Sequence, residues 1–254
     1  MDFTQLYDTF NALENPGFWQ DAYMKFYRAW FYKDRWTMYF DGLLTTIEVT
    51  VIALIIGIIL GVVVAMVRTA HDQQRPGRRK NPLLGLANAI CKVYVTVIRG
   101  TPMMVQLLIM GLVIFASSRN KTMIGALSLG INSGAYVAEI IRGGLMSLDI
   151  GQTEAGRSLG LGYLDTMRFI VIPQAFKAIL PALGNEFITL LKDTSLINVI
   201  GGKEIVYFAQ AVITNTYEPM YPYIITAIMY LIMVLIFTWL QGRLERRLRE
   251  SDRR

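Results

Sequence analysis

Five stretches of the chain are rich in apolar residues and are long enough, or nearly so, to cross a lipid bilayer. They cover residues 43–67, 87–116, 122–148, 174–200 and 221–240. A helix that crosses the hydrocarbon core needs about 20 predominantly apolar residues. The pattern therefore predicts an all-α polytopic membrane protein with about five transmembrane helices.

Polar residues interrupt several of these stretches. The first carries Gly57 and Gly61, four residues apart on one helix face, which favours close packing against another helix. The second is broken after Arg99, where Thr101 and Pro102 resemble the N-cap and the first residue of a new helix. We therefore expect a tightly packed first span, and an interfacial helix that breaks at this point before the second span begins.

The composition narrows the class of protein. Hydrophobic residues make up 54% of the 254 residues and charged residues 17%, whereas soluble proteins carry about 25% charged residues. A single cysteine, Cys91, and a single histidine, His71, leave little for a disulfide framework, a metal site or a catalytic centre. The net charge of +6 lies beside apolar stretches and not on a basic face with aromatics, so no nucleic-acid partner is expected.

The charges also predict the orientation of the spans. Residues 68–82 hold five lysines and arginines and residues 242–254 six arginines, as cytoplasmic segments do, whereas residues 1–42 hold six acids against four bases. Five spans then place the N-terminus outside and the C-terminus in the cytoplasm. By the same alternation residues 149–173 are cytoplasmic, and residues 203–219 are expected to form a short external helix.

These features divide the chain into three parts. Residues 1–40 are rich in aromatics and charged throughout, which predicts an amphipathic extension, interfacial or external, in contact with membrane lipid. Residues 41–245 form the transmembrane domain, and residues 246–254 form a basic cytoplasmic tail.

The cytoplasmic segment 149–173 is too long for a simple connection, because loops between helices are usually shorter. Its sequence predicts two short helices: the first stops at Gly160 and the second ends at Pro173. A helix–glycine–helix elbow of this kind is stiff enough to transmit a push from a partner protein.

Four motifs in this chain resemble those of one family. Residues 154–173 resemble the EAA loop of importer-type ATP-binding-cassette (ABC) permeases, whose pattern is EAA, three residues, G, nine residues, I-x-L-P; Gly156 and Ile172 depart from it. The polar amino acid permeases are the most similar group, through the stretches IRGTPMMVQLL, AYVAEIIRGGL and IPQAFKAILPALGNEFITLLKDTSLINVIG. The resemblance covers about residues 40–245.

The resemblance implies a type I importer fold and a set of partners. Two ATPase subunits per complex would bind ATP and Mg and hydrolyse ATP, since this chain has no GxxxxGK[ST] loop and binds no cofactor itself. A second permease copy or paralogue, an extracytoplasmic amino-acid-binding protein and the inner membrane of a prokaryote complete the picture. The residues implied in ATPase coupling are Glu154, Ala155, Gly156, Arg157, Leu159 and Gly160.

Polar side chains within the spans are candidates for the substrate pathway. Asn132, Tyr136 and Glu139 recur on one helix face, although Glu139 could instead pair with Arg142 one turn on. Arg99 beside a helix start could hold a substrate carboxylate, or could extend to the membrane surface. The acidic residues Glu139 and Asp193 would favour a cationic amino acid as substrate, but only weakly. The full set is Arg99, Thr101, Gln106, Asn132, Ser133, Tyr136, Glu139, Lys192, Asp193, Thr194 and Ser195.

The sequence thus predicts the permease subunit of an ATP-driven importer for a polar amino acid, cationic ones included. The alternatives are a self-sufficient secondary carrier or channel for small polar solutes, in which the polar stripes are the whole mechanism, and a membrane enzyme, for which the chain offers few catalytic groups.

Overall fold

A computed structural model describes residues 2–72, 74 and 81–251, and its regular structure in these ranges is helical. The elements in chain order are α1 (Phe3–Asn11), α2 (Phe18–Trp30), η1 (Tyr32–Asp34), α3 (Arg35–Asp72), α4 (Pro82–Gly100), α5 (Met103–Leu108), η2 (Ile109–Ile114), α6 (Lys121–Met146), α7 (Ile150–Ser158), α8 (Tyr163–Thr166), η3 (Met167–Val171), α9 (Ile172–Asp193), η4 (Thr194–Ile200), α10 (Ile205–Thr216) and α11 (Met220–Ser251).

Five helices among the described residues are long and apolar enough to cross a membrane, which confirms the predicted number. They are Tyr32–Asp72, Pro82–Gly100, Lys121–Met146, Tyr163–Ile200 and Met220–Leu248. The chain is therefore an integral membrane protein. The predicted break in stretch 87–116 is present, but the prediction of an interfacial helix before it was wrong: the helix long enough to span is α4, before the break, and the part after the break is a separate shorter helix, Met103–Ile114.

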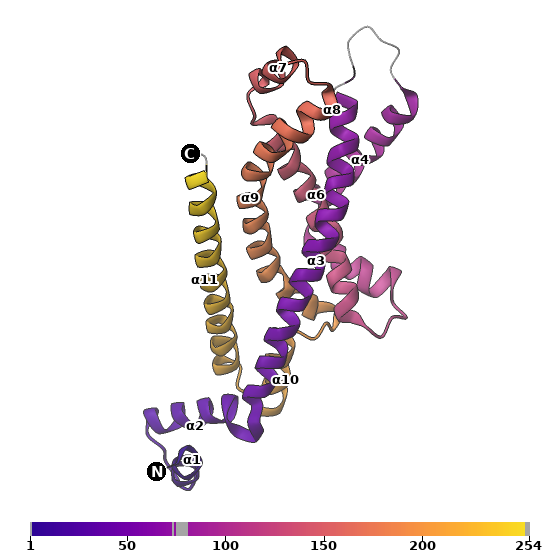
Figure 1. The fold of residues 1–254 in the computed structure, drawn as a ribbon. Coiled ribbons are helices and arrows are strands. Elements are labelled where there is room, and N and C mark those ends of the chain that lie inside the picture. Colours follow the sequence, from indigo (N-terminus) through magenta and orange to yellow (C-terminus); the bar gives the residue numbers. More distant parts are fainter. Residues whose placement is uncertain (1, 73, 75–80, 252–254) are drawn as a thin grey trace.

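The long helices run side by side, and the segments outside them gather at two opposite ends (Figure 1). Helices α7 and α8 and the C-terminus lie at one end, and α1, α2 and α10 lie at the other. Helix α10 is the short helix predicted within residues 203–219. Helix α11 continues into the predicted basic tail as far as Ser251. Most of the basic residues of the predicted cytoplasmic segment 68–82 lie outside the described residues.

Close packing of α3 on α6 forms the centre of the molecule, as the two glycines predicted. A Cβ atom added at Gly57 would lie 2.7 Å from Ser133 Oγ, and one added at Gly61 would lie 2.7 Å from Val137 Cβ. From the other side, a Cβ at Gly130 would lie 2.7 Å from Ile56 Cβ. Only glycine allows the two helices to approach this closely.

The fourth span differs from its prediction at Pro173. The second short helix of the elbow does not end there but continues through η3 into α9, with Pro173 in the first turn of α9. A proline is tolerated in a first turn, where its missing N–H is not needed. The preceding π-helical turn η3 widens the backbone just before it.

A buried glutamate joins the elements at the α10 end. Glu204 is the N-cap of α10, where its carboxylate accepts hydrogen bonds from Val206 N at 2.9 Å and Tyr207 N at 3.0 Å. It also accepts one from the hydroxyl of Tyr230 on α11 at 2.8 Å. The residue has no exposed surface, and this burial raises the pKa of the Glu204 carboxyl to about 7.

Candidate functional site: the cytoplasmic elbow and an arginine-rich cluster

Residues 149–173 form the predicted helix–glycine–helix elbow. Asp149 caps α7 by accepting a hydrogen bond from Gly151 N at 2.9 Å. At the other end Gly160 has a φ of +80°, and Gly160 N and Leu161 N donate to Arg157 O and Gly156 O at 2.9 and 3.1 Å. This is a Schellman C-cap, which confirms that α7 stops at Gly160.

The departure from the family pattern at Gly156 has a structural reason. Gly156 is buried where α7 packs on the second short helix, and an added Cβ would lie 2.8 Å from Thr166 Cγ2 and 3.1 Å from Ile170 Cδ1. Glycine therefore allows closer packing than the alanine of the family pattern. A hydrogen bond of 3.1 Å from Gln174 Nε2 to Gln152 Oε1 links the same two segments.

The other predicted coupling residues lie on the surface of the elbow. Glu154, Ala155, Arg157 and Leu159 are exposed, and the side chain of Leu159 is 80% exposed. Leu164 is exposed to 78% on the adjacent helix α8. The elbow therefore presents apolar and charged side chains together, beyond the ends of the spans, where a soluble partner could reach them.

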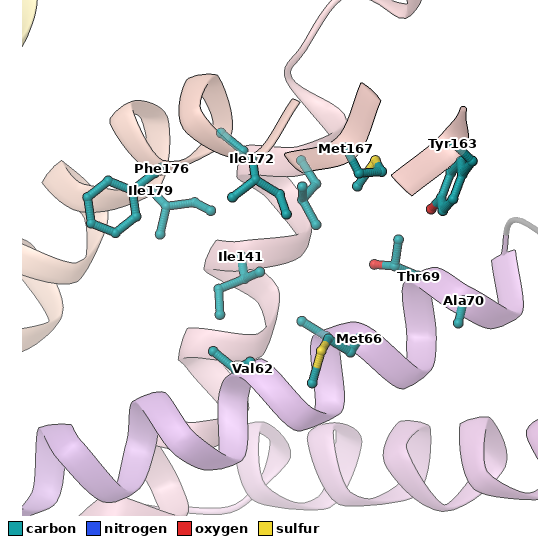
Figure 2. Close-up of a pocket in the computed structure, with 13 residues that line it drawn as sticks. Val62, Met66, Thr69, Ala70, Ile141, Tyr163, Met167, Ile172, Phe176 and Ile179 are labelled. Atoms are coloured by element: carbon teal, nitrogen blue, oxygen red, sulfur yellow. The ribbon is translucent and has the colours of Figure 1, made fainter. Parts of the chain in front are cut away.

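An apolar pocket of about 440 Å³ separates the elbow from α3. Figure 2 shows Tyr163, Met167 and Ile172 on the elbow side of this pocket. Val62 and Met66 of α3 face them across it. The two short helices of the elbow thus pack closely on each other, whereas the elbow packs less tightly against the first span.

A cluster of charges surrounds Glu139 on α6. Its carboxylate forms an ion pair with Arg68 of α3, lies 3.6 Å from Arg99 Nη1 and lies 3.8 Å from Arg142 Nε. The predicted pair with Arg142 therefore exists but is one contact of three. Arg68 was missing from the predicted site because it stood in the predicted loop 68–82.

The cluster borders a polar pocket of about 250 Å³, lined by Arg68, Lys92, Val95, Thr96, Arg99 and Glu139. Three basic side chains face one carboxylate, so the pocket carries an excess of positive charge. The guanidinium of Arg99 also lies over the ring of Tyr136, 5.3 Å from its centroid.

Three further predicted residues form hydrogen bonds at the break between α4 and α5. Gln106 Nε2 donates to Thr101 Oγ1 and to Ile98 O, each at 2.8 Å, and its Oε1 accepts from Asn132 Nδ2 of α6 at 3.0 Å. The Thr101 hydroxyl donates to Val97 O at 2.8 Å. Thr101 therefore satisfies the end of α4 and is not the N-cap of α5, which is Pro102.

The remaining predicted residues lie away from the Glu139 cluster. Ser133 donates a hydrogen bond of 2.7 Å to Glu186 of α9, a residue that the predicted site did not include. Helices α6 and α9 run in opposite directions. Measured along the helices from the Ser133–Glu186 hydrogen bond, Glu139 lies about 9 Å toward the elbow, and Lys192 lies about 9 Å in the opposite direction. Lys192, Asp193, Thr194 and Ser195 are thus separated from Glu139 by about 20 Å along the helices.

The spans, the elbow beyond their ends and the charged cluster between them are the features of a membrane permease, a transport subunit and not an enzyme. The chain belongs to the family described as binding-protein-dependent transport system inner membrane component, which it matches over residues 83–250. This membership implies a substrate-binding protein and ATPase subunits as partners.

Curated relatives cover most of the transmembrane domain. The chain is 38% identical over 168 residues to the glutamine transport system permease protein GlnP of Escherichia coli (strain K12), which covers 65% of this chain and 77% of that protein. It is 36% identical over 185 residues to the arginine transport system permease protein ArtQ of Bacillus subtilis (strain 168), covering 67% and 84%.

Solved structures agree with the fold. A crystal structure of an amino acid ABC transporter with histidines is 39% identical, with a TM-score of 0.74, and covers 83% of this chain and 94% of that chain. An inward-facing structure of the MetNI methionine ABC transporter has a TM-score of 0.68 at 18% identity, covers 83% and 96%, and supports the fold alone.

Proposed function

We propose that this chain is the membrane subunit of an ATP-driven importer for a polar amino acid. The substrate class follows from the relatives named for glutamine and arginine transport and from the amino acid transporter of similar structure. The family membership disfavours a self-sufficient carrier or channel. In the proposed complex the N-terminal end faces outside and the elbow faces the cytoplasm of a prokaryote.

The complex that we propose contains two ATPase subunits, which bind ATP and Mg, and a second permease that is a copy or a paralogue of this chain. An extracytoplasmic amino-acid-binding protein delivers the substrate at the end opposite the elbow. Hydrolysis by the ATPases drives alternating access through the elbow.

The exposed surface of the elbow carries the coupling part of the proposal. Glu154, Arg157 and Leu159 combine charge with an exposed apolar group, as the contact residues of a docking surface do. Gly160 and the buried Gly156 shape the elbow, and Ala155 leaves room for the partner to approach.

We place the substrate pathway along the charged pocket, at Arg99, Tyr136 and Glu139. The excess of positive charge there suits the α-carboxylate that every amino acid carries. A cationic side chain would find Glu139 already paired with Arg68, so the pocket favours an uncharged polar side chain over a cationic one. Thr101, Gln106, Asn132 and Ser133 support the helices around the pathway, and residues 192–195 lie toward its other end.

Reversal of one charge on the elbow tests the coupling. In the complex coexpressed with its partner ATPase, Glu154→Lys should lower ATP-dependent uptake by about ten-fold or more, equivalent to about 1.4 kcal/mol of docking free energy. Gly160→Asp should act in the same way, because aspartate is strained at a φ of +80°.

Glu14→Lys is the matched control, since it makes the same charge reversal at an exposed position near α1, at the opposite end of the molecule. It should leave copurification of the ATPase unchanged. If both elbow variants copurify with the ATPase and transport normally, the elbow is not the coupling element.

A further inference from the structure

Two exposed aromatic side chains stand at the start of α2, at the end of the molecule opposite the elbow. The side chain of Trp19 is 81% exposed and that of Phe18 is 77% exposed. Their rings pack against each other edge to face, with centroids 5.2 Å apart. Aromatic side chains of this size are costly to leave in water.

The rest of α2 defines which way this pair faces. Trp19, Phe26 and Trp30 recur at positions i, i+7 and i+11, so they share one face of the helix. Phe26 contacts Tyr221 of α11, with ring centroids 6.5 Å apart, and Trp30 stacks on Tyr39 of α3 at 5.5 Å. The face that carries Trp19 is therefore the face that α2 turns toward the spans.

The contacts of α2 also place it at the depth where a span begins. Phe26 meets Tyr221 in the first turn of the span Met220–Leu248. Lys25 Nζ lies 3.5 Å from a carboxylate oxygen of Glu218, two residues before that span. Helix α2 therefore crosses the spans where α11, a helix long and apolar enough to cross a membrane, begins. Tryptophan is enriched at the membrane–water boundary of membrane proteins.

Figure 1 shows α2 running across the ends of α11 and α3, with its first turn extending past α11. Near its end α2 is covered by protein, but its first turn is not. In the first turns of α11, which α2 crosses, Tyr223, Ile224 and Ile228 are also about half exposed. A bilayer that surrounds α11 would thus meet Phe18 and Trp19 directly.

We propose that the first turn of α2 inserts Phe18 and Trp19 into the headgroup region of the bilayer leaflet at this end of the spans. The occupant of this surface is lipid. Asp21 and Arg28 lie on the other side of the helix, which gives α2 the amphipathic character of an interfacial helix. The contacts of Lys25 and Phe26 then tie the α10–α11 turn to the same leaflet.

Helix α1 completes the arrangement on the water side. It packs on α2 through stacked rings, Tyr7 on Tyr27 at 4.6 Å and Phe3 on Phe31 at 5.1 Å. It lies on the side of α2 away from α11 (Figure 1). Its exposed residue Asp8 should therefore face water.

Tryptophan fluorescence of the full chain in lipid nanodiscs tests this placement. The variant Trp30→Phe/Trp36→Phe/Trp239→Phe leaves Trp19 as the single emitter. We expect nitroxide lipids labelled near the headgroup to quench it several-fold more strongly than lipids labelled deep in the acyl chain, and aqueous iodide to quench it weakly. Strong quenching by iodide without quenching by lipid would overturn the proposal.

Spin labels give a second test that retains the other tryptophans. In a Cys91→Ser background, a label at Trp19→Cys should be reached by oxygen more readily than by an aqueous nickel complex, and a label at Asp8→Cys should show the reverse. Protection of position 19 from both reagents would indicate cover by protein, a second copy or the binding protein, and would contradict the proposal.

Discussion

Glu139 is the central residue of the charged cluster, because its carboxylate faces three arginines. It faces Arg68, Arg99 and Arg142, so its removal leaves Arg68 and Arg99 without their counter-charge, while Arg142 keeps Asp72 at 3.9 Å. Its position beside a polar pocket and the contact of Arg99 with Tyr136 suit a role in the pathway as well as in the structure.

Two variants separate these roles. Glu139→Gln should lower uptake by roughly ten-fold, the effect of about 1.4 kcal/mol, while the complex still assembles. The double variant Arg68→Gln/Glu139→Gln removes the main ion pair altogether and should recover thermal stability without recovering uptake. Recovery of uptake by the double variant would reduce Glu139 to a structural partner of Arg68.

The buried Glu204 predicts a pH dependence of stability. Its pKa in the folded protein is about 7, above the ordinary value of 4.5, so the folded state binds the proton more tightly than the unfolded chain. This tighter proton binding contributes fully to the free energy of unfolding below pH 4.5. The contribution declines as the pH rises to about 7, by up to about 3 kcal/mol. The apparent Tm in detergent should therefore fall over this range.

Glu204→Gln keeps the shape of the side chain but cannot ionise. Its apparent Tm should fall less between pH 4.5 and about 7 than that of the unchanged protein, because all other titrating groups are shared. Identical pH profiles for the two proteins would exclude Glu204 as the source.

At the scale of helices, a local signal in the sequence predicts the end of α7, whereas the predicted N-cap at Thr101 and the predicted helix end at Pro173 were wrong. The end of α7 at Gly160 depends only on local features: the positive φ of Gly160 and the hydrogen bonds donated by Gly160 N and Leu161 N. Arg68 shows the limit: the charged sequence around it reads as a loop, but α3 continues to Asp72 and brings Arg68 to Glu139, 71 residues away. No local pattern contains that contact.

Gly156 and Lys192 illustrate two further limits. Helix propensity shows that a glycine in α7 is costly, but only the packing against Thr166 explains why it is there. Lys192 and Glu139 are both polar residues in spans, and only the antiparallel course of α6 and α9 separates them. The predicted pathway therefore joins residues that the fold places far apart, and their role in transport stays a prediction.

The packing of α3 on α6 can be tested with one methyl group. Gly61→Ala would bring a Cβ to 2.7 Å from Val137 Cβ, a rigid branched side chain, and should destabilise the protein by about 1–3 kcal/mol. Gly143→Ala is the control within α6, since an added Cβ there meets nothing within 4 Å. It should leave the apparent Tm unchanged or raise it slightly; equal loss in both variants would exclude close packing as the cause.

At the scale of the whole molecule, the elbow and the α1–α2 pair lie at opposite ends of the spans (Figure 1). In our proposal this arrangement separates the surface that docks on the ATPase from the surface that meets the lipid and the binding protein. The charged pocket and the break between α4 and α5 lie between the two ends, where we propose that the solute passes.

Transport by purified components tests the central claim most directly. Proteoliposomes holding this chain, its partner permease and the partner ATPase would receive the binding protein outside and ATP and Mg inside, with labelled polar amino acids as substrates. We predict accumulation of an amino acid that requires ATP, the binding protein and Glu154. Uptake by the permease alone, unaffected by ATP or the ATPase, would contradict the importer and identify a self-sufficient carrier.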